Sequence, residues 1–193
     1  MRKLIFLFCI VTLASCDRHV SYQAIDVTVP LEKADFYLPD FNGKQRSLAD
    51  FRGKVVLLFF GYTNCPLVCP TTLADLAQIM GLLGKDAGRI QVIFITVDPE
   101  HDTPEVLAKF IPFFHSSFLG LSGDAESIAQ AAKAFGVGYE KQYYKDGGYT
   151  FLHSDGTFLI GATGRPILLS RYGQKAELLV KDIRLLLAKN PSH

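Results

Sequence analysis

This 193-residue chain has few cysteines, no cluster of basic residues and no internal repeat. Its four cysteines fall in two places, and Cys9 and Cys16 belong to an N-terminal leader. That leaves Cys65 and Cys69 as the one thiol pair of the exported chain. No run of Lys and Arg exceeds two residues and the net charge is +1, which excludes the dense basic surface that nucleic acid binding requires. We therefore expect no nucleic acid partner and one domain with a real hydrophobic core.

The chain also lacks an apolar run long enough to cross a bilayer. Arg2 and Lys3 precede an apolar stretch over residues 4–13, which is typical of a signal peptide rather than of a spanning helix. The stretch ends in Leu-Ala-Ser before Cys16, which resembles the cleavage box of bacterial lipoproteins, where the cysteine is lipidated and becomes the new N-terminus. An ordinary secretory signal with a chance cysteine is the alternative. Acyl chains on Cys16 would be enough for a peripheral anchor.

These signals divide the chain into three parts. Residues 1–15 are predicted to be a lipoprotein signal peptide, residues 16–34 a lipid anchor and tether, and residues 35–193 the folded domain. Asp17 follows Cys16, which in many Gram-negative bacteria favours retention of a lipoprotein at the inner membrane. We therefore expect the domain in the bacterial cell envelope, lipid-anchored on the periplasmic face of the inner membrane.

The order of apolar patterns predicts an α/β domain. Continuous apolar runs over residues 55–60 and 90–97 are typical of strands that are covered on both faces. Thr103 is expected to cap a helix whose first residue is Pro104. Helices are predicted over 71–83, 104–114, 124–135 and 176–189, and further strands over 36–44 (with a turn), 118–121, 137–144 and 149–158. This order fits a thioredoxin-like sheet with extra elements at the front and between Asp98 and Gly136.

Cys65 and Cys69 follow the first buried strand, and each precedes a proline. Residues before proline avoid the α region, so the segment between the cysteines is predicted to be a tight loop with Pro70 as the first helical residue. Cys69 would then lie at the helix N-terminus, where free N–H groups and the helix dipole stabilise a thiolate. The three intervening residues suit two tasks: forming a disulfide, and holding a soft metal ion between two thiolates.

Two structural explanations of the pair are weaker. A purely structural disulfide is compatible with an exported protein, but it would close a very short loop and stabilise the fold little. A structural zinc site would need a second pair of ligands, which the sequence does not offer.

A metal site at the thiol pair would need a third ligand, and the chain has five histidines. His19 lies in the tether and His193 at the end of the chain. His115 ends a helix, where a surface or C-cap role is expected, and His101 lies in an acidic loop, where it is expected to be solvated or to pin the loop. His153 lies on or beside a late strand, and its spacing alone leaves open whether it is a ligand.

Three ordered blocks of the sequence resemble the Sco (SenC) family of copper chaperones. The blocks are GYTNCPLVCP at 61–70, VDPEHDTP at 97–104, and His153-Ser154 ahead of a glycine-containing strand segment. The resemblance extends from about residue 36 to residue 187. It implies a thioredoxin-like fold with an N-terminal β-hairpin extension and an inserted helix-containing segment. It also implies that Cys65, Cys69 and His153 bind copper.

The same resemblance implies a function in the assembly of cytochrome c oxidase. The chain would deliver copper to, or reduce the cysteines of, the binuclear copper centre of subunit II. The expected partners are that subunit or another copper-site protein, a thioredoxin-like reductant, and the inner membrane through the lipid anchor. Two soft thiolates favour Cu(I), and an added imidazole lets the site hold Cu(II) as well. Two positions depart from the family: Leu67 stands where aspartate is common, and an Asp-Pro-x-Gly turn is replaced by residues 161–164.

A second hypothesis is a membrane-tethered thiol–disulfide oxidoreductase with Cys65 and Cys69 as its redox-active pair. Generic thioredoxin-type enzymes have two residues between the cysteines and a proline just before a late strand. Here the cysteines are separated by three residues, and no proline lies between Pro112 and Pro166. A metallochaperone is therefore favoured, and enzymatic activity stays open because the two roles can coexist.

A peroxiredoxin-like peroxidase is the third and weakest hypothesis. Such enzymes need a Pro-x-x-x-Thr-x-x-Cys loop. Here Thr63 lies only two residues before Cys65, and Phe59 occupies the place of the proline.

Overall fold

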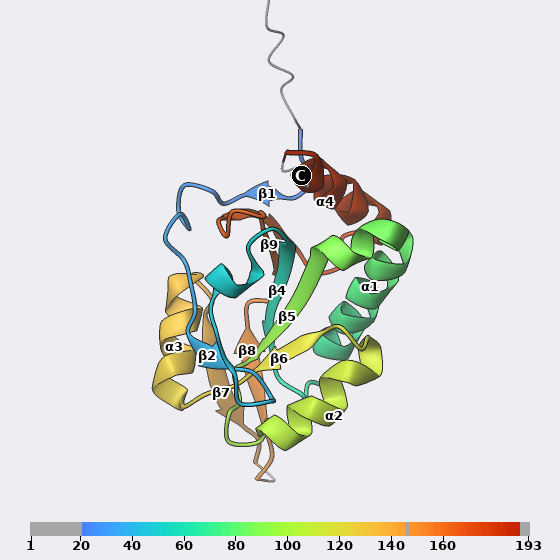
Figure 1. Cartoon of the computed structure of the whole chain (residues 1–193). Coiled ribbons are helices and arrows are strands. Elements are labelled where there is room, and N and C mark those ends of the chain that lie inside the picture. Colours follow the sequence, from blue (N-terminus) through green and yellow to red (C-terminus); the bar gives the residue numbers. More distant parts are fainter. Residues whose placement is uncertain (1–20, 146, 190–193) are drawn as a thin grey trace, which may run out of the picture.

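The computed structural model describes residues 21–145 and 147–189, so the signal peptide and Cys16 lie outside the described residues. Its centre is a six-stranded mixed sheet with strand order β1-β10-β9-β4-β5-β6 (Figure 1). The strands of this sheet are β1 (Ile25–Asp26), β4 (Val55–Gly61), β5 (Ile90–Thr96), β6 (Leu119–Leu121), β9 (Thr157–Ile160) and β10 (Pro166–Ser170). The α/β class predicted from the sequence is confirmed.

Within residues 21–145 and 147–189, four α-helices surround the sheet. They are α1 (Val68–Leu83), α2 (Pro104–Phe114), α3 (Ala125–Ala134) and α4 (Ala176–Lys189), with short 3-10 helices at η1 (Leu48–Phe51) and η2 (Gly84–Arg89). Figure 1 shows α1, α2 and α4 along one side of the molecule and α3 on the other. Thr103 accepts a hydrogen bond from Val106 N and Pro104 begins α2, which confirms the predicted cap. No helix in the described part of the chain is long and apolar enough to span a membrane.

Strands β4 and β5 form the middle of the core. They run parallel, from the pair Val55↔Ile90 to the pair Gly61↔Thr96, and every residue of β4 is buried. Because both faces are covered, the strand reads as a continuous apolar run instead of an alternating one. Phe60 packs against Phe135 at the end of α3, with ring centroids 5.8 Å apart. This burial makes the C-terminal end of β4 a rigid base for the residues that follow it.

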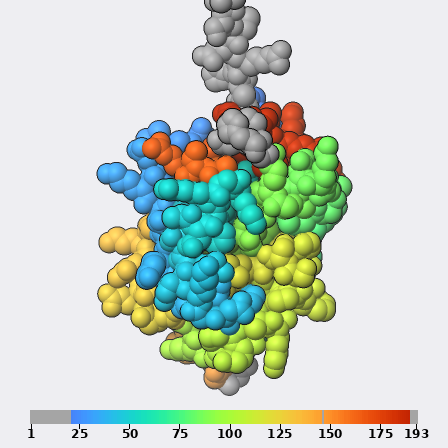
Figure 2. Space-filling model, viewed as in Figure 1, coloured from blue at the N-terminus to red at the C-terminus, as the bar shows by residue number. Residues whose placement is uncertain are grey.

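The N-terminal hairpin expected from the family resemblance is present. Strands β2 (Leu38–Pro39) and β3 (Gln45–Arg46) pair antiparallel, and Gly43 lies in the turn with φ +80°. The carboxylate of Asp40 is buried and accepts hydrogen bonds from the backbone N–H groups of Asn42 and Lys44. In the space-filling view the N-terminal segment, blue to cyan, covers the middle of the visible face between α3 and α2 (Figure 2).

Part of the segment expected to be a tether packs on the fold. Within residues 21–34, β1 pairs antiparallel with β10 at the edge of the sheet. The backbone N–H groups of Gln23 and Ala24 donate to the carboxylate of Asp182 in α4, which is fully buried. The folded part therefore includes residues before position 35.

The late strands differ from the prediction. A single strand over 149–158 is wrong, because the chain turns at Ser154–Gly156 and forms two strands in different sheets, β8 (Tyr149–His153) and β9. Strand β8 pairs with β7 (Tyr139–Tyr143) in a separate hairpin. At the turn, a Cβ on Gly156 would lie 2.5 Å from a methyl group of Leu169 and 3.2 Å from the carbonyl oxygen of Ser170, so a larger residue would require the Leu169 side chain to move. Strand β10 was not predicted from the sequence.

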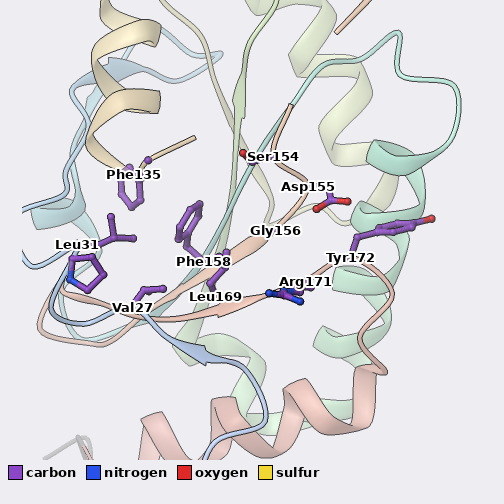
Figure 3. A pocket seen from close by; sticks show the side chains of 12 residues that line it. Val27, Leu31, Phe135, Ser154, Asp155, Gly156, Phe158, Leu169, Arg171 and Tyr172 are labelled. Carbon is purple, nitrogen blue, oxygen red and sulfur yellow. The ribbon is translucent and has the colours of Figure 1, made fainter. Parts of the chain in front are cut away.

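A hollow of about 500 Å³ lies beside the same turn (Figure 3). Apolar side chains form much of its lining: Val27, Leu31, Phe135, Phe158 and Leu169. None of Cys65, Cys69 and His153 lines it, so the hollow is separate from the thiol pair.

Candidate metal centre

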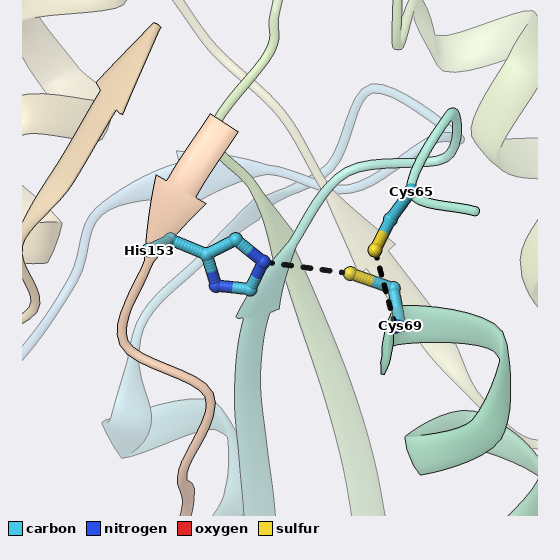
Figure 4. Close-up of side chains that lie close together, drawn as sticks. All are labelled: Cys65, Cys69 and His153. Carbon is cyan, nitrogen blue, oxygen red and sulfur yellow. Dashed lines mark hydrogen bonds between the residues drawn. The ribbon is translucent and has the colours of Figure 1, made fainter. Parts of the chain in front are cut away.

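The structure brings Cys65, Cys69 and His153 together. Their potential ligand atoms all lie within 4.8 Å of one another, and Sγ of Cys69 is 3.6 Å from Nε2 of His153. Cys65 lies in the loop after β4, Cys69 in the first turn of α1, and His153 at the end of β8 (Figure 4). Three separate elements thus converge on one point at the C-terminal end of β4.

The start of α1 differs from the prediction. The helix begins at Val68, so Cys69 and Pro70 are its second and third residues. A proline is tolerated there because the N–H groups of the first helical turn have no intrahelical acceptor. The N–H group of Cys69 donates to Sγ of Cys65 at 3.4 Å. The sulfur of Cys65, and not that of Cys69, therefore accepts hydrogen bonds from the free N–H groups at the start of the helix.

The two thiols have opposite electrostatic environments. Burial by itself would raise the pKa of Cys65, but hydrogen bonds from the backbone of Cys69, Leu67 and Val68 outweigh it and leave the pKa below its usual value. Cys69 is completely buried, and the loss of solvent raises the pKa of its thiol well above the usual range. The nearby charge of Cys65 adds to this rise. The predicted stabilisation of a Cys69 thiolate is therefore wrong for the metal-free fold, because burial outweighs the helix start.

His153 presents Nε2 to the thiols. Its Nδ1 lies 2.9 Å from the carbonyl oxygen of Ser154, and a carbonyl can only accept, so Nδ1 carries the proton. In the neutral imidazole, Nε2 is then the nitrogen with the lone pair, and it faces Sγ of Cys69. This arrangement, in which a backbone carbonyl fixes the tautomer, is common among metal-binding histidines. The rings of Tyr62 and Phe59 lie edge-on to the imidazole, with centroids 5.9 and 6.2 Å away.

A second group of potential ligands, Asp98, His101 and Asp102, holds the cysteine loop in place. Asp102 is fully buried and accepts hydrogen bonds from the backbone N–H of Thr63 at 2.9 Å and from the hydroxyl of Thr96 at 2.6 Å. The imidazole of His101 lies 3.0 Å from the Asp102 carboxylate. Donors already occupy both oxygens of Asp102, so this carboxylate and His101 shape the cysteine loop.

Sequence reasoning missed two aromatic residues around the site. Tyr62 is almost completely buried, and its hydroxyl lies 2.9 Å from the hydroxyl of Thr150. The hydroxyl of Tyr149 donates to the carboxylate of Asp98 at 2.6 Å. Both bonds join segments that are far apart in the chain, and no local pattern in the sequence signals them.

The donor set defines what the centre can hold. Two thiolate sulfurs are soft ligands and an imidazole nitrogen is a borderline one, a combination that suits copper or zinc. Among the described residues the group has these three members and no fourth Cys, His, Asp or Glu, so it does not form the closed four-ligand cage of a structural zinc site. Cys65 is partly exposed, which leaves one side of the group open to an incoming molecule.

Comparison with known proteins gives a consistent result. The SCO1/SenC family model matches residues 28–188. The human protein named "Protein SCO2 homolog, mitochondrial" is 37% identical over 157 residues, which cover 79% of this chain and 58% of the human protein. The chain thus spans less than two thirds of the length of the mitochondrial relatives that it matches.

Solved structures show the same fold. The structure of Bradyrhizobium japonicum ScoI with copper bound is 36% identical, covers 85% of this chain and 100% of that chain, and has a TM-score of 0.73. The solution structure of apo Sco1 from Thermus thermophilus is 45% identical, covers 80% of this chain and 91% of that chain, and has a TM-score of 0.72. The thioredoxin-like fold predicted from the sequence is confirmed.

Proposed function

Because this chain belongs to the SCO1/SenC family, we propose that it binds copper through Cys65, Cys69 and His153 and passes the ion to a partner protein. One observation carries the proposal: the two sulfurs and the imidazole lie within 4.8 Å of one another although they come from three elements. The copper-bound structure of a protein that is 36% identical supports the choice of metal.

The ligand set suits both oxidation states of copper. Two thiolates satisfy Cu(I), which prefers soft ligands, and the imidazole nitrogen adds the third ligand that Cu(II) needs. His153 is held in the tautomer that offers Nε2. Cys65 is partly exposed whereas Cys69 is buried, so a partner's ligand reaches the ion from the Cys65 side and replaces that thiolate first. Copper then leaves by stepwise ligand exchange.

We place the protein on the periplasmic face of the bacterial inner membrane, anchored by lipid on Cys16. The support is the lipoprotein-like cleavage box and the aspartate that follows Cys16. The acceptor proposed from the family resemblance is subunit II of cytochrome c oxidase or another copper-site protein. A thioredoxin-like reductant would keep the thiol pair reduced.

Thiol–disulfide exchange is the second candidate function, and the contrast between the two thiols favours it. A partly exposed thiol of lowered pKa beside a buried one is suited to attack and resolution. The Cys65 thiolate would attack a partner's disulfide and release one partner thiol. Cys69, on losing its proton, would then displace the second, which leaves the partner reduced and a Cys65–Cys69 disulfide behind. A thioredoxin-like reductant returns the two electrons.

Anaerobic titration with Cu(I) and with Cu(II) tests the proposal. The reduced wild-type protein should bind one tight equivalent and show thiolate-to-copper absorption with Cu(II), and Cys65→Ser should lose both. If the folded, fully reduced wild-type protein binds neither ion tightly, the proposed chaperone function is refuted, and thiol–disulfide exchange becomes the better account.

A further inference from the structure

His153 is carried by a hairpin that the main sheet does not hold. Strands β7 and β8 pair with each other and, in the part of the chain that the structure describes, with no strand of the central sheet. Cys65 and Cys69, in contrast, follow directly from β4, the most buried strand of that sheet. Residues 154–156 join His153 to β9 of the main sheet, and side-chain contacts of β8 add to this link in setting the distance between the imidazole and the thiols.

Two side-chain hydroxyls link β8 to the main body. The hydroxyl of Tyr62 lies 2.9 Å from the hydroxyl of Thr150, the second residue of β8 and three positions before His153. The hydroxyl of Tyr149, the first residue of β8, donates to Asp98 at 2.6 Å. Tyr62 follows β4 and Asp98 follows β5, so each link joins the hairpin to the C-terminal end of a buried parallel strand.

The link through Tyr62 is the one closest to the metal ligands. Tyr62 lies three residues before Cys65, and its ring is edge-on to His153, with the centroids 5.9 Å apart and the planes at 85°. The same ring packs on Phe151, in the middle of β8, at 5.3 Å. One side chain thus contacts β8 on both sides of Leu152 and belongs to the segment that carries the first thiol.

We propose that Tyr62, through its hydrogen bond with Thr150, is a positioning residue that sets where the His153 imidazole lies relative to the two thiols. The inference rests on the copper site of the proposed function. It concerns Cu(II) more than Cu(I), because two thiolates satisfy Cu(I) whereas Cu(II) depends on the third ligand. Without the hydroxyl pair, the ring of Tyr62 still packs on Phe151 and His153, but β8 keeps one fewer hydrogen bond to the main body, the Tyr149–Asp98 bond.

The test is a double-mutant cycle in the full chain with Tyr62→Phe and Thr150→Val, singly and together. Each single variant should weaken Cu(II) binding by about tenfold, as expected for the loss of one hydrogen bond, and should shift the Cu(II) absorption and EPR signals. The double variant should be no worse than either single one, because both remove the same bond. Cu(I) affinity should stay within about twofold of the wild type.

Tyr143→Phe is the matched control. Tyr143 is a tyrosine of the same hairpin, 72% exposed, and far from His153 along the strand. Its variant should keep the wild-type Cu(II) spectrum. Wild-type spectra and affinity in Tyr62→Phe, or effects of the two substitutions that add in the double variant, would overturn the inference.

A metal-free measurement separates this inference from the copper site itself. In the reduced protein without copper, amide hydrogen exchange over residues 150–153 should be faster in Tyr62→Phe than in the wild type, because the hairpin end has lost one attachment. Unchanged exchange there would overturn the positioning role even if copper binds. A wild-type protein that binds no copper would instead refute the proposed function, and the exchange measurement would still decide whether Tyr62 holds the hairpin.

Discussion

The sulfur of Cys69 lies 3.6 Å from Nε2 of His153, although 84 positions separate the two residues in the chain. The contact joins the first turn of α1 to the end of a hairpin outside the main sheet. The Ser154 carbonyl holds the proton of the imidazole on Nδ1, so the nitrogen that faces the sulfur is the one with a free lone pair. The ligand group is therefore in place before any ion arrives, which lowers the cost of reorganisation on binding.

Replacing His153 should weaken the binding of Cu(II) much more than the binding of Cu(I). In His153→Ala we expect Cu(II) binding to weaken by at least about tenfold with a changed absorption spectrum, because only the sulfurs remain. Cu(I) binding and formation of the Cys65–Cys69 disulfide should persist. His115→Ala is the control, since His115 caps α2 and contacts Ser117 rather than the thiols. An unchanged Cu(II) spectrum in His153→Ala would exclude the three-ligand site.

The two cysteines should differ in their reaction with iodoacetamide. The lowered pKa of Cys65 means that at neutral pH a larger share of this thiol is ionised than in an ordinary cysteine, and the thiolate is the reactive form. Cys69 is buried and its pKa is raised, so it should stay unmodified while the protein is folded. Mass spectrometry of the reduced protein after short labelling at several pH values would show this. Faster labelling of Cys69 than of Cys65 would contradict the assigned environments.

Copper binding should release a proton from Cys69. Because its pKa is raised well above neutrality, this thiol is protonated in the metal-free fold at pH 7, and only its thiolate can bind the ion. Affinity should therefore fall as the pH falls, since protons compete for the ligands. Titration of reduced protein with Cu(I) in a weakly buffered solution should release about one proton or more per ion. Cys69→Ser should release less, whereas binding without proton release by the wild type would show that Cys69 is not a ligand.

The buried carboxylate of Asp182 should stabilise the fold. It accepts backbone hydrogen bonds from Gln23 and Ala24 at 2.9 to 3.0 Å, and its substitution leaves these N–H groups without their acceptor. We expect Asp182→Ala to lower the free energy of unfolding by about 1–3 kcal/mol in urea denaturation and to make the N-terminal segment more accessible to proteases. The neighbouring exposed Lys181→Ala should change stability by less than about 0.5 kcal/mol. Equal effects of the two variants would show that the hydrogen bonds to Asp182 do not stabilise the fold.

Local patterns in the sequence predicted the parts of the fold that depend on neighbouring residues. The continuous apolar runs of β4 and β5 follow from burial on both faces, and the Thr103–Pro104 start of α2 follows from capping alone. The break between β8 and β9 was missed because it depends on strand pairing: β8 pairs with β7, whereas β9 pairs with β4 and β10 of the central sheet. Such pairings leave no periodic signal.

The site was predictable to a similar degree and for similar reasons. Cys65 and Cys69 are close in sequence, so their pairing could be inferred from spacing. His153 comes near them only through the hairpin, and spacing alone did not select it; the family resemblance did. The assignment of the more acidic thiol failed because full burial of Cys69 outweighs its place in the first helical turn. Burial is a property of the whole fold and cannot be read from the motif.

The attachment of residues 23 and 24 to α4 would shorten the tether of a lipid-anchored domain. With the proposed lipid on Cys16, only residues 17–22 lie between the anchor and the first backbone bond to Asp182. A fully extended chain covers at most about 3.5 Å per residue, so this six-residue tether would span at most roughly 20 Å. A domain on so short a tether would be confined to a thin layer above the bilayer. An acceptor in the same membrane would have a high effective concentration in that layer. Copper exchange in that layer would be governed by lateral diffusion of two membrane proteins, and lengthening the segment between Cys16 and Tyr22 would change the rate without touching the metal site.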